Sequence, residues 1–202
     1  FLDLKPDLEV VLREVHQGLS LAAKAISPKF FYDERGSELF DAITELPEYY
    51  VTRTEMALFD AHMAEISACL EENICVIEYG SGSTKKIRRL LEVLQPQAYV
   101  PVDISGDYLL SNAEVLLSDF PALKIFPVCA DITQSFDLPS QVEALRPLGF
   151  YPGSSIGNFE PTDAVEFLRR VHVTLGTGGY FLVGVDAKKD VSILEAAYDD
   201  AA

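Results

Sequence analysis

A glycine turn follows the first strongly apolar run of the sequence. The run ICVIE ends at Glu78, and the turn Gly80-Ser81-Gly82 precedes a stretch with helical periodicity. Glycines at these positions let the backbone turn tightly and let a ligand approach it closely. A dinucleotide-binding turn needs a third glycine where Lys85 stands, and a phosphate-binding loop needs the pattern GxxxxGK. The turn therefore predicts another kind of ligand site at Gly80, Ser81 and Gly82, with a purely structural turn as the alternative.

Glu78, Asp103 and Asp131 stand at the ends of three successive apolar runs. Asp103 follows the glycine turn at the distance where an acid reaches two ribose hydroxyls, although it could instead cap the helix expected near Gly106. Asp131 is placed to accept a hydrogen bond from an adenine amino group while Ile132 packs on the ring. Glu78 matches the acid that organises the amino-acid end of the cofactor in S-adenosylmethionine enzymes. Together the three acids favour an adenosine site.

A GxSxG pattern at residues 153–157 raises a different possibility, the nucleophile turn of a serine hydrolase. Such a turn needs a helix that starts directly at Ser155 and, later in the chain, an acid followed by a histidine. The only later histidine, His172, shares one predicted helix with the only intervening aspartate, Asp163, so a triad is disfavoured. Asn158 suits methyl transfer better, because its carbonyl oxygen can accept a hydrogen bond from an amine and orient the nitrogen lone pair.

The elements that must position these residues alternate in type from residue 74 onward. The predicted strands are apolar throughout, which is typical of a parallel sheet covered on both faces. We therefore expect a doubly wound, Rossmann-like α/β domain, whose ligands bind beyond the carboxyl ends of its strands. The predicted strands are 74–78, 98–103, 122–131, 148–151 and 180–186, and the helices between them are 85–94, 106–117 and 162–175.

Helices are also expected before this domain. Apolar residues recur at helical spacing in residues 6–25, and a second helical stretch covers about 54–70. The segment between them is rich in aromatic residues and is interrupted by proline and glycine, which indicates a loop, a short helix and a second loop. We divide the chain into residues 1–72, helices and an aromatic loop that covers the site, and residues 73–202, the Rossmann-like domain.

Composition limits the partners. The chain has 202 residues, of which 49% are hydrophobic, and a formal net charge of −16, the wrong sign for a phosphate backbone. The first residues lack a secretory signal, and no apolar stretch is long enough to span a bilayer. Three widely separated cysteines indicate neither a disulfide framework nor a zinc site. We expect a cytoplasmic monomer that acts on a small molecule, with no metal and no nucleic-acid or membrane partner.

Five segments in a fixed order resemble the histidine-specific Nα-methyltransferases, which use S-adenosyl-L-methionine to form hercynine on the route to ergothioneine. The aromatic segment is the most specific, because generic cofactor-binding domains lack it. The resemblance extends from about Ser27 to the end of the chain. The segments are FFYDERGSELFDAITELPEYYVTRTE, IEYGSGSTKKIRRLL, VPVDIS, PGSSIGNFEP and AYDDAA.

The resemblance implies roles for individual residues. Tyr49, Asn158 and Tyr198 are implied contacts to the carboxylate or amine of the substrate, although Tyr50 is an alternative to its neighbour Tyr49. Tyr32 is expected to cover the cofactor, with Phe40 nearby. The remaining implied cofactor residues are Gly80, Lys86, Asp103, Asp131 and Ile132.

The expected reaction is three successive N-methylations of one amino acid. Methyl transfer from a sulfonium is an in-line displacement, so the protein mainly supplies orientation and an unprotonated nitrogen. Asn158 and the hydroxyl of Tyr49 are the residues expected to position the amine. Family members carry the residues that recognise imidazole in a further C-terminal segment, which we expect to be absent from this chain. Another amino acid or small amine as substrate, and a non-catalytic adenosine-binding fragment, are the alternatives.

Overall fold

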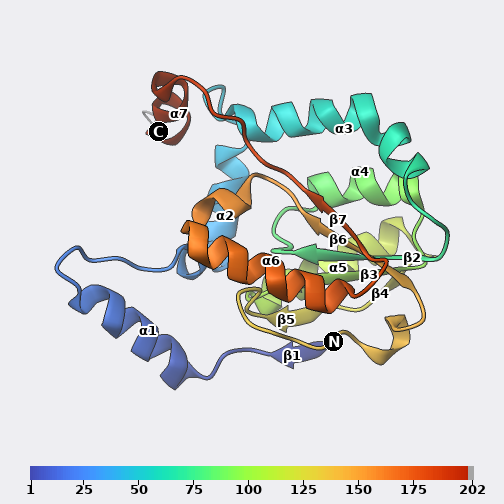
Figure 1. Ribbon diagram of the computed structural model, residues 1–202, viewed down its shortest axis with the longest axis horizontal. Helices are drawn as coiled ribbons and strands as arrows, with labels where there is room; N and C mark the ends of the chain where they lie inside the picture. The colour runs from blue at the N-terminus through green and yellow to red at the C-terminus, as the bar shows by residue number, and fades with distance from the viewer. Residues whose placement is uncertain (200–202) are drawn as a thin grey trace.

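The computed structural model describes residues 1–199, except for the side chain of Glu34. Its centre is a parallel sheet in the order β1-β5-β3-β2-β6-β7, with the short β4 paired to β3 (Figure 1). The strands are Leu2–Leu4 (β1), Ile74–Tyr79 (β2), Ala98–Asp103 (β3), Lys124–Ile125 (β4), Val128–Ala130 (β5), Arg146–Tyr151 (β6) and Tyr180–Val183 (β7). Each of these strand pairs is parallel, which confirms the predicted doubly wound fold.

Helices cover both faces of the sheet. On one face, α3, α4 and α5 pack through residues such as Phe59, Ile87 and Leu116. On the other, α6 packs through Phe167 and Val171. Every residue of β2 is buried, as its apolar run requires for a strand covered on both sides. The helices are Leu8–Ser20 (α1), Glu34–Ile43 (α2), Tyr50–Ala68 (α3), Thr84–Leu94 (α4), Gly106–Asp119 (α5), Pro161–Leu175 (α6) and Val191–Tyr198 (α7).

The strand order reverses at β2. From β2 the chain proceeds through β3 to β5 on one side and then returns to place β6 and β7 on the other. A crevice forms at such a reversal, outside the carboxyl ends of the strands, because the two connections leave in opposite directions. The glycine turn after β2 and the acids after β3 and β5 therefore meet at one edge of the sheet.

Several boundaries differ from the sequence predictions. The strand β1 was not predicted, because three residues are too few for a periodic signal, yet its Leu2 pairs with Val128 of β5. The strand expected at 122–131 is divided into β4 and β5 beside Pro127, which has no N–H to donate to the ladder. The helix α3 begins earlier than expected, at Tyr50, and α1 ends earlier, at Ser20.

The helix α1 stands away from the body of the molecule (Figure 1). None of its residues is buried, and Leu8 and Leu12 are 69% and 59% exposed. Its amphipathic pattern therefore predicted the helix correctly but not its separation from the core. Across residues 1–199, no helix has both the length and the apolar character needed to cross a membrane.

Candidate functional site

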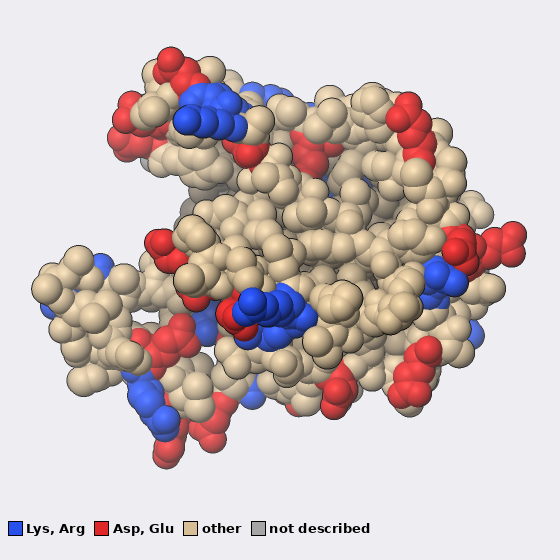
Figure 2. Space-filling view, viewed as in Figure 1, with Lys and Arg blue, Asp and Glu red and all other residues tan. Residues whose placement is uncertain are grey.

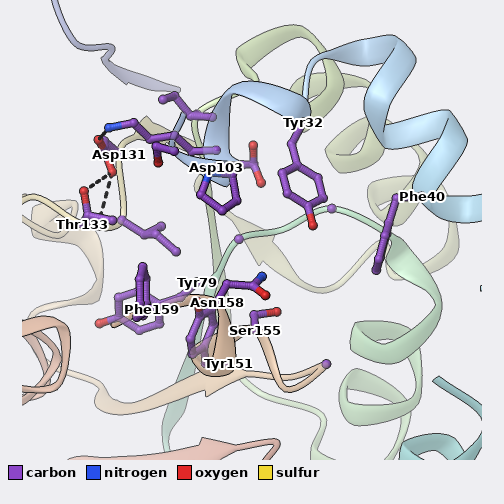
Figure 3. Close-up of a pocket in the computed structure, with 18 of the residues that line it drawn as sticks. Tyr32, Phe40, Tyr79, Asp103, Asp131, Thr133, Tyr151, Ser155, Asn158 and Phe159 are labelled. Atoms are coloured by element: carbon purple, nitrogen blue, oxygen red, sulfur yellow. Dashed lines mark hydrogen bonds and ion pairs between the residues drawn. The ribbon is translucent and has the colours of Figure 1, made fainter. Parts of the chain in front are cut away.

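One cavity of about 840 Å³ opens at the carboxyl edge of the sheet. Figure 3 shows Asp131 and Thr133 toward one end, Tyr32 and Phe40 toward the other, and Asp103 and Asn158 between them. The predicted site residues that line the cavity are Tyr32, Phe40, Gly80, Gly82, Lys86, Asp103, Asp131, Ile132 and Asn158. Three others lie outside its lining, namely Ser81, Tyr49 and Tyr198.

The glycine turn leaves open space on the side of the cavity. Gly80 has a φ of 76°, a backbone conformation that glycine adopts without steric penalty. A Cβ atom added at Gly80 or Gly82 would meet no atom within 4 Å. Ser81 turns the opposite way, since its side chain is buried and its Oγ lies 3.0 Å from the hydroxyl of Tyr99. The turn therefore offers backbone, not the Ser81 side chain, to a ligand.

Glu78 is buried beneath this turn. Its side chain is 2% exposed and accepts a hydrogen bond from the hydroxyl of Tyr99. Burial raises the pKa of Glu78 to about 7, although hydrogen bonds from Tyr99 and Ser81 oppose the rise. Tyr99 was not identified from the sequence. The one feature that could have indicated it is that it bears a hydroxyl inside the otherwise apolar run AYVPVD.

Asp103 lines the cavity and supports the turn that leads into α5, but it does not cap that helix, whose N-cap is Ser105. Its Oδ1 accepts a hydrogen bond from the N–H of Ser105, the N-cap of α5, at 2.8 Å, and its side chain also lines the cavity. Burial raises the pKa of Asp103 to about 6, against the effect of hydrogen bonds from the Ser105 and Ile104 N–H groups. A carboxylate has enough lone pairs to hold the turn and accept from a ligand.

Asp131 already has protein partners on both oxygens. The N–H and hydroxyl of Thr133 lie 2.9 and 2.6 Å from Oδ1, and the ammonium of Lys29 lies 2.7 Å from Oδ2. Burial acts to raise the pKa of Asp131, but these hydrogen bonds and the nearby ammonium outweigh it and lower the pKa. Lys29 also contacts Glu14 of α1 at 2.7 Å. The sequence analysis missed Lys29, which lies next to the aromatic segment and 102 residues from Asp131.

A row of aromatic rings leads from the cavity to α7. Tyr32 contacts Phe40, Phe40 contacts Tyr49, and Tyr49 contacts Tyr198, each edge to face, with centroids 5.9, 6.2 and 5.7 Å apart. Tyr49 is 6% exposed, whereas Tyr198 is 64% exposed. Burial, followed by the neighbouring Tyr198 hydroxyl, raises the pKa of Tyr49 well above its ordinary value. Tyr49 and Tyr198 thus continue the row of aromatic rings behind Phe40, outside the cavity lining.

Tyr50 faces a different group of residues. Its hydroxyl donates to Asp186 and lies 2.7 Å from the ammonium of Lys189, which also stacks over the Tyr50 ring at 3.9 Å. Tyr50 lines a second, smaller pocket. The adjacent tyrosines therefore separate, because Tyr49 joins the aromatic row while Tyr50 ties α3 to the segment after β7.

The turn after β6 carries Asn158. A 3₁₀ turn begins directly at Ser155, but Ser155 itself is not in the left-handed region, whereas Gly153 and Ser154 before it are, with φ values of 81° and 59°. The Ser155 hydroxyl lies 3.0 Å from the carbonyl oxygen of Pro152, and His172 is exposed outside the cavity lining. No histidine is among the described residues that line the cavity. The geometry gives no support to a hydrolase, while Asn158 reaches the cavity (Figure 3).

A family model described as histidine-specific methyltransferase, SAM-dependent, matches residues 11–202. The chain belongs to this family. The histidine N-alpha-methyltransferase of Mycolicibacterium smegmatis is 38% identical over 198 residues, covering 96% of this chain and 61% of that protein. Ergothioneine biosynthesis protein 1 of Neurospora crassa is 33% identical, covering 84% of this chain and 20% of that protein. The chain thus spans about three fifths of the length of the first relative.

The solved structures agree with the fold. The mitomycin 7-O-methyltransferase MmcR matches with a TM-score of 0.53 at 14% identity, covering 94% of this chain and 53% of that one. At this identity the likeness concerns the fold alone, and it supports the Rossmann-like methyltransferase architecture that was predicted.

The cavity fits the cofactor of the histidine-specific methyltransferase family. The open space above Gly80 and Gly82 is the room that a ligand needs to approach the turn. Thr52 of α3 also lines the cavity, and its buried hydroxyl has no hydrogen-bond partner within the described part of the chain. A buried hydroxyl without a partner is costly, so a polar ligand group is its natural complement. The sequence analysis did not select Thr52.

Proposed function

We propose that this chain binds S-adenosylmethionine in the cavity and methylates the α-amine of histidine three times, forming hercynine for ergothioneine biosynthesis. The observation that carries the proposal is that one cavity collects the glycine turn, the acids Asp103 and Asp131, and Asn158. The names of the two relatives, histidine N-alpha-methyltransferase and ergothioneine biosynthesis protein 1, support the substrate and the pathway.

Each part of the cavity suits one part of the cofactor. We assign Asp131 and Ile132 to adenine and Asp103 to the two ribose hydroxyls, since all three residues line the cavity. The glycine turn and Lys86 are placed for the amino-acid end, because an ammonium and exposed backbone N–H groups bind a carboxylate. The rings of Tyr32 and Phe40 line the cavity beside this end of the cofactor, and their faces can stabilise a cation.

The bound cofactor supplies an already activated methyl group on its sulfonium. The chain has to hold the substrate nitrogen in line with that methyl and keep its lone pair free. The side-chain carbonyl of Asn158 is suited to accept a hydrogen bond from the amine. The Tyr49 hydroxyl is protonated at neutral pH, as in any tyrosine, and can donate to the substrate carboxylate. The Tyr50 hydroxyl is already engaged by Asp186 and Lys189. Tyr49 instead packs against Phe40 of the cavity lining, and this difference favours Tyr49 as the substrate contact.

Charge supports a small-molecule substrate. The net charge is −16, and on the face in Figure 2 the Lys and Arg side chains lie in separate small groups among Asp and Glu. A nucleic-acid surface needs a continuous basic stripe. The charge distribution thus favours an amino acid over a nucleic acid as the substrate. That the chain is a cytoplasmic monomer is a separate part of the proposal.

Two measurements test the proposal. Calorimetry should show stoichiometric binding of S-adenosylhomocysteine to this chain. Radiolabelled methyl transfer, tested on a panel of amino acids and small amines, should then favour histidine and give a product heavier by three methyl groups. Transfer to another amine would replace the substrate assignment, and cofactor binding with no transfer to any of them would identify a non-catalytic binding domain. Absence of cofactor binding would overturn the proposal.

A further inference from the structure

Glu55 of α3 contacts two residues that line the cavity, Lys86 and Gly153. Its side chain is 12% exposed, and one carboxylate oxygen, Oε2, lies 2.7 Å from the ammonium of Lys86. Both carboxylate oxygens accept from the N–H of Gly153, at 2.9 and 3.0 Å. Lys86 belongs to the helix after the glycine turn, and Gly153 begins the turn that carries Asn158. One carboxylate therefore joins the two turns.

Two glycines make room for this ion pair, Gly184 beside the carboxylate and Gly153 beside the ammonium. A Cβ atom at Gly184, just after β7, would lie 2.1 Å from Oε1 of Glu55 and 3.1 Å from the Gly153 nitrogen. A Cβ atom at Gly153, whose φ is +81°, would lie 3.0 Å from the Lys86 ammonium. Both glycines belong to segments packed around Glu55. The arrangement is thus built from four separate parts of the chain, and a side chain at Gly184 could not be accommodated without displacing the carboxylate.

The charges of Glu55 and Lys86 depend on one another. Lys86 is also 12% exposed, so neither charge of the pair is well hydrated. Removing one partner of such a pair leaves the other poorly compensated, whereas the intact pair keeps the ammonium fixed in one place. A fixed ammonium beside the glycine turn is what a ligand carboxylate requires for an oriented ion pair.

We propose that Glu55 is a positioning residue that holds Lys86, beside the cofactor, and the Gly153–Asn158 turn, beside the amino-acid substrate, in one fixed arrangement. The inference rests on the proposed function. The carboxylate makes two contacts with separate effects. Its negative charge orients Lys86, and its acceptor oxygens orient the turn through the N–H of Gly153. These contacts can be removed separately, because a glutamine keeps an acceptor oxygen and loses the charge.

The test compares Glu55→Gln with Glu55→Ala. Glu55→Gln should weaken S-adenosylhomocysteine binding about tenfold while the KM for the amino acid changes by less than about threefold. Glu55→Ala should weaken cofactor binding similarly and also raise the amino-acid KM about tenfold or more, because Gly153 then loses its acceptor. Gly184→Ala, at a residue outside the cavity lining, should reproduce part of both effects by displacing the carboxylate.

Asp60→Asn is the matched control. Asp60 also lies on α3 and also pairs with a cation of α4, Arg89, at 2.8 Å, but this pair is exposed. We expect Asp60→Asn to change neither cofactor binding nor KM. Equal effects of Glu55→Gln and Glu55→Ala on the two ligands, or effects that merely follow the loss in thermal stability, would overturn the inference. A wild-type protein that fails to bind S-adenosylhomocysteine would overturn the proposed function itself, so the two failures are distinguishable.

Discussion

The ammonium of Lys29 lies 2.7 Å from Oδ2 of Asp131, across the cavity edge where adenine is expected. The side chains are 18% and 7% exposed, so the pair is largely shielded from water. A cofactor amino group that uses Asp131 must therefore share the carboxylate with Lys29 or displace it. The pair also anchors the segment that leads to Tyr32, three residues later.

Lys29→Met should destabilise the fold by about 1–3 kcal/mol, because it leaves the buried Asp131 carboxylate without its cation. Asp131→Asn in the same chain should recover part of this loss, since it removes the unpaired charge. Thermal or denaturant unfolding of the two single variants and the double variant measures the coupling. Lys24→Met, at an exposed lysine, is the control. Additive effects of the two substitutions would show that the ion pair contributes nothing to stability.

Cofactor binding should depend on the protonation of Asp103. Its pKa is about 6, and only the ionised carboxylate accepts hydrogen bonds from both ribose hydroxyls. Affinity for S-adenosylhomocysteine should therefore be constant above about pH 7 and fall roughly tenfold by about pH 5. Calorimetry across this range measures the effect.

Asp103→Asn should bind more weakly by roughly 1–3 kcal/mol and lose this pH dependence. Glu78, with a pKa of about 7, is the other acid that changes charge near this range, so Glu78→Gln separates its contribution. Identical pH profiles for wild type and Asp103→Asn would rule out Asp103 as the titrating group.

Gly82→Val should abolish cofactor binding without unfolding the protein. A Cβ atom at Gly82 meets no protein atom within 4 Å, so the side chain would project into free space where the ligand is expected. Gly82→Ala should weaken binding less than Gly82→Val does. Gly157→Ala, whose Cβ would lie 3.8 Å from the Ser154 hydroxyl, is the control. Calorimetry and circular dichroism together test this, and a Gly82→Val protein with wild-type affinity would place the cofactor elsewhere.

Asn158→Ala should slow methylation of the amino acid and leave cofactor binding nearly unchanged. Loss of a hydrogen bond to the amine should reduce kcat/KM about tenfold to a hundredfold while S-adenosylhomocysteine affinity stays nearly constant. Ser155→Ala should leave methyl transfer largely intact, because the Ser155 hydroxyl donates a hydrogen bond to the carbonyl oxygen of Pro152. Steady-state kinetics on both variants decides the matter. An essential Ser155 with a dispensable Asn158 would revive the hydrolase interpretation.

The sequence by itself determined the sheet and the edge at which the site forms. Apolar runs such as ICVIE specify strands buried on both faces, and parallel strands bring their carboxyl ends to one edge. Gly80, Asp103, Asp131 and Asn158 each stand at or beyond the carboxyl end of a strand, so their gathering around one cavity could be predicted from local pattern. The aromatic segment indicated the family, and the family resemblance in turn indicated Tyr32 and Phe40 as site residues.

Only the tertiary structure decided which partners these residues have. Lys29 meets Asp131 from 102 residues away, and Glu55 meets Gly153 from 98 residues away. It also decided that Tyr49 joins the aromatic row while Tyr50 turns to Asp186. Periodicity reports which side of an element is apolar, because burial repeats with the turn of a helix or the pleat of a strand. It carries no information on which distant polar atom will face that side, because that depends on how helices dock on the sheet.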